Sequence, residues 1–149
     1  QPLPESYVLL HPFSRGKDKS LSVHDVTSFA EELAPISVVL AGRTEAEVPS
    51  RPNLISYLNK TSLHELIDLL RHARYIVSVD SGPMHIAAAL TERLVAIHTW
   101  SDPRKVGPYQ PNAWVWQNGE LRQMRHIDGL PGAIARDIRE LAAFVKTHL

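Results

Sequence analysis

The chain has 149 residues, of which 44% are hydrophobic, and it carries 16 basic and 16 acidic side chains. Its length suits a single domain over residues 1–149, and its zero formal net charge gives no electrostatic footprint for nucleic acid or acidic lipid. The lack of cysteine excludes a disulfide framework, a thiolate metal site and a cysteine nucleophile. No apolar run approaches the ~20 residues of a membrane span. Residues 1–6 are predicted to be a linker without a signal-peptide pattern.

Short apolar runs predict strands at residues 7–10, 37–40, 53–56, 75–79, 94–97 and 113–116, the last of them at an edge of the sheet. Helices are predicted after Ser22 and after Ser62, since an acidic residue three positions later resembles a capping box in each case. Another helix is predicted over residues 83–90, with proline in the permitted first turn. The last helix is predicted after Pro131, with one apolar face formed by Ile134, Ile138, Leu141 and Val145.

The alternation of strands and helices predicts the fold class. Strands that are apolar throughout are typical of a parallel sheet covered on both faces. We therefore predict an α/β fold, a Rossmann-like parallel sheet of about six strands sandwiched by helices. Ligands of such sheets bind at the carboxyl ends of the strands. The loops after Leu10, Leu40, Ser56, Val79 and Ile97 are expected to face one site.

The loop after the fourth predicted strand, residues 80–85, is the most informative segment. Backbone N–H groups at a helix N-terminus, with the helix dipole behind them, can hold an anion. Gly82 is expected to permit a tight turn, and Pro83 has no N–H to offer. The remaining donors would be Ser81, Gly82, Met84 and His85. An ordinary strand-to-helix turn capped by Asp80 or Ser81 fits the same residues, so both interpretations stay open at this point.

Other candidate residues follow the first two strands. Lys19 could supply a point charge to the same anion, and Glu45 stands where dinucleotide-binding folds place a carboxylate on ribose hydroxyls. Taken alone, a lysine or glutamate in a loop is more often a solvated side chain, and for Glu45 the sequence favours that interpretation. The histidines show no metal-binding spacing, so no metal site is predicted. The glycine-rich nucleotide motifs and the Gly-x-Ser-x-Gly nucleophile elbow are also absent from the sequence.

Two segments of the chain form a pattern together. The first is Lys60-Thr61-Ser62-Leu63-x-Glu65-Leu66, and the second runs from Ser78 through Asp80-Ser81-Gly82-Pro83-Met84-His85 to Leu90. With these two segments the chain resembles the heptosyltransferase family, glycosyltransferase family 9. Weaker similarities are His11-Pro12 followed by Lys19, Ala41-Gly42 followed by Glu45, and Ser101-Asp102-Pro103. The resemblance covers nearly the whole chain, and the segment from Asp80 to Leu90 is its specific part.

The resemblance implies the C-terminal, donor-binding half of a GT-B glycosyltransferase. It implies an inverting, metal-independent transfer from a nucleotide-sugar, typically ADP-heptose, in the synthesis of lipopolysaccharide or a related glycan. The donor-binding residues it implies are Ser14 and Lys19 for the diphosphate, Glu45 for the ribose, Thr61 for the base, and Asp80, Ser81, Gly82, Pro83, Met84 and His85 for the phosphates and sugar. No cofactor is implied. The general base and the acceptor site are expected in an N-terminal domain that this chain lacks.

The sequence departs from the family pattern at two places. Leu21 and Ser22 stand where the family often has an aromatic residue and a proline, and Thr99-Trp100 stand where it usually has Gly-Pro. Trp100 is therefore expected to narrow or reshape the sugar pocket, so the donor need not be ADP-heptose. The resemblance implies a cytoplasmic location, at the inner membrane for the longer protein. The alternatives are a stand-alone nucleotide- or phosphate-binding module and, more distantly, a ligand-free interaction domain.

Overall fold

A computed structural model describes residues 3–149, apart from the side chain of Lys17. The first two residues of the predicted linker lie outside the described residues. The strands are β1 (Val8–His11), β2 (Val38–Leu40), β3 (Leu54–Ser56), β4 (Tyr75–Val79), β5 (Leu94–Ile97), β6 (Trp114–Gln117), β7 (Glu120–Gln123) and β8 (Ala133–Ile134). The helices are α1 (Val23–Leu33), α2 (Leu63–His72), α3 (Gly82–Leu90), α4 (Pro103–Val106) and α5 (Ile138–Thr147), with 3-10 turns at Lys17–Lys19 and Met124–His126.

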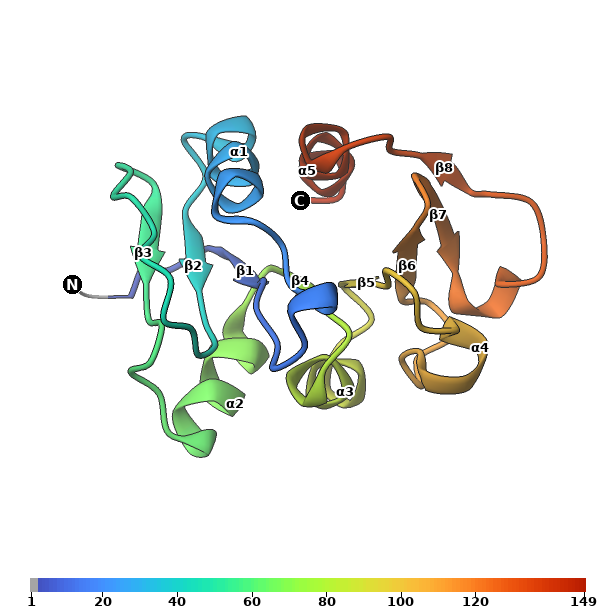
Figure 1. Ribbon diagram of the computed structural model, residues 1–149, viewed down its shortest axis with the longest axis horizontal. Coiled ribbons are helices and arrows are strands. Elements are labelled where there is room, and N and C mark those ends of the chain that lie inside the picture. The colour runs from blue at the N-terminus through green and yellow to red at the C-terminus, as the bar shows by residue number, and fades with distance from the viewer. Residues whose placement is uncertain (1–2) are drawn as a thin grey trace.

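All eight strands form one sheet in the order β3-β2-β1-β4-β5-β6-β7-β8. Strands β1 to β6 pair in parallel, while β7 pairs antiparallel with both β6 and β8. Helices α1 and α5 cover one face of the sheet, and α2 and α3 cover the other (Figure 1). The predicted α/β Rossmann-like sandwich is confirmed. The order of the strands reverses between β1 and β4, where doubly wound sheets bind their ligands.

Side chains that alternate along the strands build a core on each face. Val8 and Leu10 of β1 and Val77 of β4 join the cluster beneath α1 and α5. Their neighbours Leu9 and Ile76 join the cluster beneath α2 and α3. All five side chains are completely buried. The central strands are therefore apolar on both sides, as a sheet covered on both faces requires.

Two helix starts follow the predicted capping chemistry. Ser62 and Glu65 form a full capping box: the Ser62 hydroxyl accepts from the Glu65 N–H at 3.1 Å, and the Ser62 N–H donates to the Glu65 carboxylate at 2.9 Å. At α1 the Ser22 hydroxyl accepts from the Asp25 N–H at 3.0 Å. Such caps satisfy donors that the helix itself leaves unpaired.

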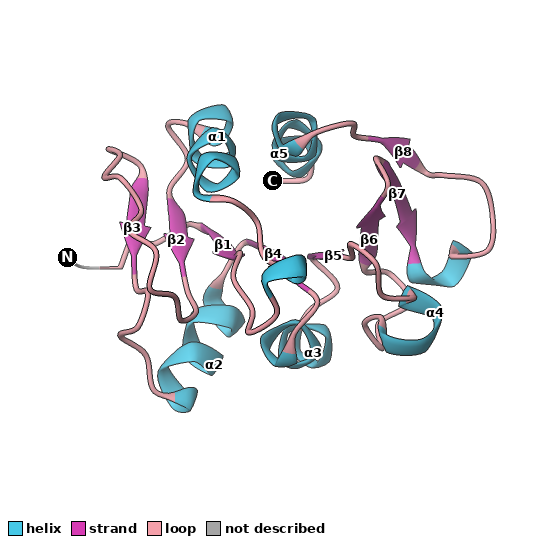
Figure 2. Ribbon diagram, in the orientation of Figure 1, coloured by secondary structure: helices cyan, strands magenta, loops and turns pink. Residues whose placement is uncertain are grey.

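The C-terminal third differs from the prediction. Strand β6 is an inner strand, not an edge strand, because the hairpin to β7 covers its outer side (Figure 2). The hairpin turns at Asn118 and Gly119, whose φ angles are 54° and 78°. This Asn-Gly pair is a strong hairpin signal that the prediction did not use. The prediction for the last helix was also wrong at its start: Ile134 lies in β8 with 59% of its surface exposed, and α5 begins after the N-cap Asp137.

Candidate functional site

The loops that follow β1, β2 and β4 meet around an open cleft of about 650 Å³ at the carboxyl edge of the sheet. His11, at the end of β1, and Asp80, after β4, line it on either side of the point where the order of the strands reverses. The cleft extends past Arg43 toward the start of α2. Seven of the predicted donor-binding residues line it: Ser14, Lys19, Thr61, Asp80, Ser81, Gly82 and Pro83.

An ion pair joins two of these loops. The Lys19 ammonium donates to Oδ2 of Asp80 at 3.1 Å, and the side chains are 29% and 7% exposed, respectively. The Ser101 hydroxyl donates to the same Oδ2 at 2.8 Å. Burial by itself would raise the pKa of Asp80, but the hydrogen bonds from Ser101 and Lys19 outweigh it and the pKa is lowered. Asp80 is therefore a fixed carboxylate at neutral pH, and it holds Lys19 beside the N-terminus of α3.

His98 extends this network into the interior. Its Nδ1 lies 2.9 Å from the Ser101 hydroxyl and 4.0 Å from Oδ2 of Asp80. Burial lowers the pKa of His98 more than the charge of Asp80 raises it, so the ring is neutral at pH 7. Among residues 3–149, its Nε2 has no hydrogen-bond partner. His98 and Ser101 were not among the predicted site residues, although both follow the end of a predicted strand.

His11 supports the opposite side of the same corner. Its Nδ1 is 3.3 Å from the Ser78 hydroxyl and 3.5 Å from the Ser81 hydroxyl. Burial lowers the pKa of His11 to about 4, so the ring is neutral. Both hydroxyls donate to the Val79 carbonyl, at 2.9 and 3.0 Å, so toward the imidazole they are left as acceptors. His11 thereby connects the end of β1 to the loop that starts α3.

The N-terminus of α3 differs in detail from the expected anion site. The Ser81 hydroxyl is the N-cap and accepts from the Met84 N–H at 3.4 Å, so that donor already has a partner. The Met84 side chain is completely buried in the core beneath α3. Gly82 does not have a positive φ, so the expected tight turn does not require glycine there. A Cβ at this position would meet no atom within 4 Å, which leaves open space along the cleft.

Three predicted residues lie outside the lining of the cleft. Glu45 is exposed on the loop after β2, whose backbone is held by Asn59 through two hydrogen bonds to Thr44, at 2.9 and 2.8 Å. His85 is exposed on α3, with its ring 6.4 Å from that of Tyr109. Met84 is the third, as part of the core. The structure thus gathers seven of the predicted donor-binding residues around the cleft and leaves Glu45, Met84 and His85 outside its lining.

Gly42 is the glycine whose conformation this corner requires. Its φ is +121°, and a Cβ there would lie 3.1 Å from the His11 ring. We expect Gly42→Ala to lower the free energy of unfolding by about 1–3 kcal/mol, because the residue would be both strained and crowded. Urea unfolding measures the change. Gly82→Ala is the matched control and should unfold like the parent, since it is neither strained nor crowded. Equal stability of the Gly42 and Gly82 variants would contradict this account.

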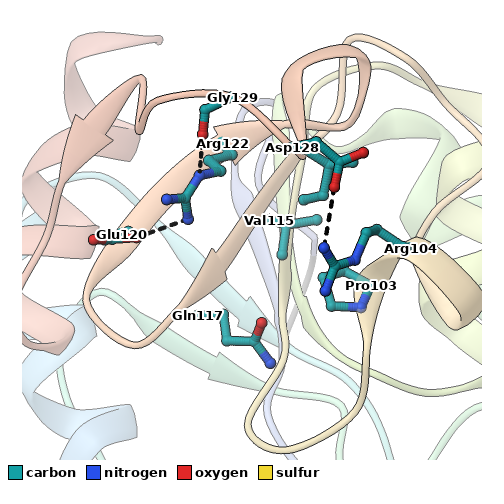
Figure 3. A pocket seen from close by; sticks show the side chains of 9 residues that line it. Pro103, Arg104, Val115, Gln117, Glu120, Arg122, Asp128 and Gly129 are labelled. Atoms are coloured by element: carbon teal, nitrogen blue, oxygen red, sulfur yellow. Dashed lines mark hydrogen bonds and ion pairs between the residues drawn. The ribbon is translucent and has the colours of Figure 1, made fainter.

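A second hollow, of about 300 Å³, lies between α4 and the β6–β7 hairpin (Figure 3). Its charged side chains are paired with one another: Arg104 with Asp128 at 3.1 Å, and Arg122 with Glu120 at 2.7 Å. Because each of these charges is already neutralised by an ion pair, the hollow offers little unpaired charge for a ligand to bind. The cleft at the carboxyl edge is the better candidate site.

Residues 3–149 contain no group of three or more histidine, aspartate or glutamate side chains placed to hold a metal ion. No helix in the same part of the chain is long and apolar enough to cross a membrane.

Comparison with known proteins identifies the family. Residues 12–128 match the model of glycosyltransferase family 9 (heptosyltransferase). The chain belongs to glycosyltransferase family 9. Among curated members, it is 30% identical over 118 residues to lipooligosaccharide heptosyltransferase 2 of Haemophilus influenzae, a match that covers 78% of this chain and 29% of the relative. It is 33% identical over 72 residues to lipopolysaccharide heptosyltransferase 1 of Escherichia coli, covering 47% of this chain and 22% of the relative.

Solved structures of family 9 have the same fold. The E. coli ADP-heptose lipopolysaccharide heptosyltransferase II superposes with a TM-score of 0.71 at 23% identity, over 97% of this chain and 47% of that one. The E. coli heptosyltransferase WaaC with ADP gives a TM-score of 0.69 at 23% identity, over 99% of this chain and 44% of that one. This family 9 chain therefore spans less than half the length of these relatives.

Proposed function

We propose that this chain is the C-terminal, donor-binding domain of an inverting glycosyltransferase whose donor is an ADP-heptose-like nucleotide-sugar. The observation that carries the proposal is the Lys19–Asp80 ion pair, held at the N-terminus of α3 beside an open cleft. A lysine and a helix N-terminus are both suited to a diphosphate. The family membership and a relative solved with ADP support this choice of ligand.

In this proposal the nucleoside lies in the part of the cleft that Arg43, Thr61 and Leu66 line. The diphosphate lies between Lys19, Ser14 and the start of α3. Glu45 would meet the ribose only after its exposed side chain turns toward the cleft. When the bond between sugar and phosphate breaks, negative charge grows on the leaving diphosphate, and Lys19 with the α3 N-terminus would stabilise that charge without a metal ion.

The acceptor-binding site and the general base would lie in a domain equivalent to the part of the relatives that this chain does not match. The glycan would be lipopolysaccharide or a related polymer, as the names of the relatives suggest. We also propose a cytoplasmic location, which the lack of cysteine fits.

We expect the 149-residue chain to bind a nucleoside diphosphate but to transfer no sugar, because it covers less than half of the solved relatives and the proposal assigns the acceptor side of the site to the rest. An assay for ADP release from ADP-heptose, with a lipopolysaccharide acceptor, tests this expectation. The full-length H. influenzae relative in the same assay is the positive control. Robust turnover by this chain would contradict the donor-only role. Binding of no nucleotide would favour a ligand-free interaction domain.

A further inference from the structure

Trp100 is an aromatic side chain that packing does not explain. It lies on the loop between β5 and α4 and is 68% exposed. Leaving so large an apolar side chain in water contributes nothing to folding. Nothing in the donor-binding proposal above uses it.

The backbone around Trp100 is held on both sides. The Gln117 amide of β6 donates to the Thr99 carbonyl at 3.2 Å and to the Ser101 carbonyl at 2.9 Å. The Thr99 hydroxyl donates to the Asp18 carbonyl at 2.8 Å. The backbone on both sides of Trp100 is thus tied to β6 and to the turn that carries Lys19.

The indole also contacts the proposed phosphate residue directly. The Lys19 ammonium lies 5.1 Å from the centroid of the Trp100 ring, within the range of a cation–π interaction. One face of the indole is therefore turned toward Lys19, and its high exposure leaves the rest of the ring open to solvent.

The order of the strands places Trp100 and the Gly42–Arg43 end of the cleft on opposite sides of Lys19 and Asp80. Gly42 and Arg43, which line the cleft, follow β2, and Trp100 follows β5. Strands β1 and β4, which carry Lys19 and Asp80 on their following loops, lie between them (Figure 1). A nucleotide-sugar with its nucleoside in the cleft and its phosphates at Lys19 would direct the sugar on its terminal phosphate toward Trp100.

We propose that Trp100 is a stacking platform for the sugar of the donor and helps to determine which sugar is accepted. The inference rests on the proposed donor-binding function. An indole face offers apolar area and little conformational entropy to lose, which suits the C–H face of a sugar ring. A nucleoside diphosphate, which has no sugar attached to its terminal phosphate, would end at Lys19 and would not reach the platform.

The test compares ADP with ADP-heptose by isothermal titration on the parent chain, Trp100→Ala and Trp100→Phe. We expect Trp100→Ala to weaken binding of ADP-heptose about three- to tenfold, the range of an aromatic contact, and to change ADP binding less than twofold. Trp100→Phe should restore most of the loss. Leu130→Ala, which truncates another exposed apolar side chain (89% exposed), is the matched control and should bind like the parent.

The possible outcomes separate the inference from the function on which it rests. If the parent binds neither ligand, the donor-binding function itself fails. If the parent binds both ligands and Trp100→Ala weakens them equally, Trp100 acts only on Lys19 and the sugar platform is overturned. Unchanged binding of ADP-heptose by Trp100→Ala would overturn it as well. Thermal unfolding of each variant checks that the folded population is the same.

Discussion

Replacing Lys19 with alanine should weaken ADP binding about ten- to a hundredfold. The substitution removes one charge-assisted hydrogen bond to phosphate, worth about 1.5–3 kcal/mol. The ammonium has three donors, and only one is needed for the Asp80 contact, so the others can meet a phosphate while the ion pair persists. Without Lys19, the Asp80 carboxylate would remain next to the ligand and repel it. Isothermal titration measures the change against a parent affinity of about 0.1–1 mM.

Two controls accompany this measurement. Lys146→Ala, which removes an exposed lysine of α5, should bind ADP like the parent. Addition of EDTA should leave the parent affinity unchanged, because the proposed site uses no metal. UDP and GDP in place of ADP would rank the bases. If Lys19→Ala binds ADP as well as the parent does, the diphosphate is not held where we propose.

Stability should fall by about 2 kcal/mol between pH 7 and pH 5 through His11 alone. Its pKa is near 6.5 in the unfolded chain and is lowered to about 4 in the folded one. Between these values the unfolded chain binds the extra proton, so the free energy of unfolding decreases as the pH falls. Each unit of pKa difference is worth about 1.4 kcal/mol. His98, whose pKa is also lowered, should add to the loss.

Urea unfolding at several pH values measures this slope. His11→Gln should flatten it, whatever the variant does to stability at pH 7. His64→Gln, which changes an exposed histidine of α2, should leave the slope as it is in the parent. Asp80 does not affect the measurement between pH 7 and pH 5. Its pKa is lowered in the folded chain, so the stabilisation that the carboxylate contributes is lost only as the pH falls to about 4 and below. A slope that is the same with and without His11 would contradict the assignment.

The central strands could be predicted from the sequence because their signal is local. The runs at residues 75–79 and 94–97 are apolar throughout, and the structure places β4 and β5 on the same residues. The hairpin of β6 and β7 was missed because three of the four residues of β7 are polar, in the sequence Glu-Leu-Arg-Gln. The start of the last helix was misjudged because Ile134 fits the apolar spacing of α5 by chance. The N-cap Asp137, whose side chain accepts from the Glu140 N–H, was the better signal.

The candidate site also contains residues that could be predicted from the sequence and residues that could not. Lys19 and Asp80 could be placed together, because both follow neighbouring strands of a parallel sheet and must meet at its carboxyl edge. His98 and Ser101 could not be predicted as site residues, because their role depends on burial and on a contact with Asp80 that joins two separate loops. No spacing in the sequence encodes such a contact. The side-chain direction of Glu45 is likewise a matter of loop geometry, which single-residue patterns do not specify.

The short outer strands of the sheet have a consequence for self-association. A long exposed strand at a sheet edge is a template on which another chain can add, which leads to aggregation. Here one edge is β3, with three residues, and the other is β8, with two. Each offers few unpaired backbone groups to an incoming strand. The antiparallel hairpin that covers β6 therefore protects the parallel sheet from edge-to-edge growth, in addition to holding the loop that carries Trp100.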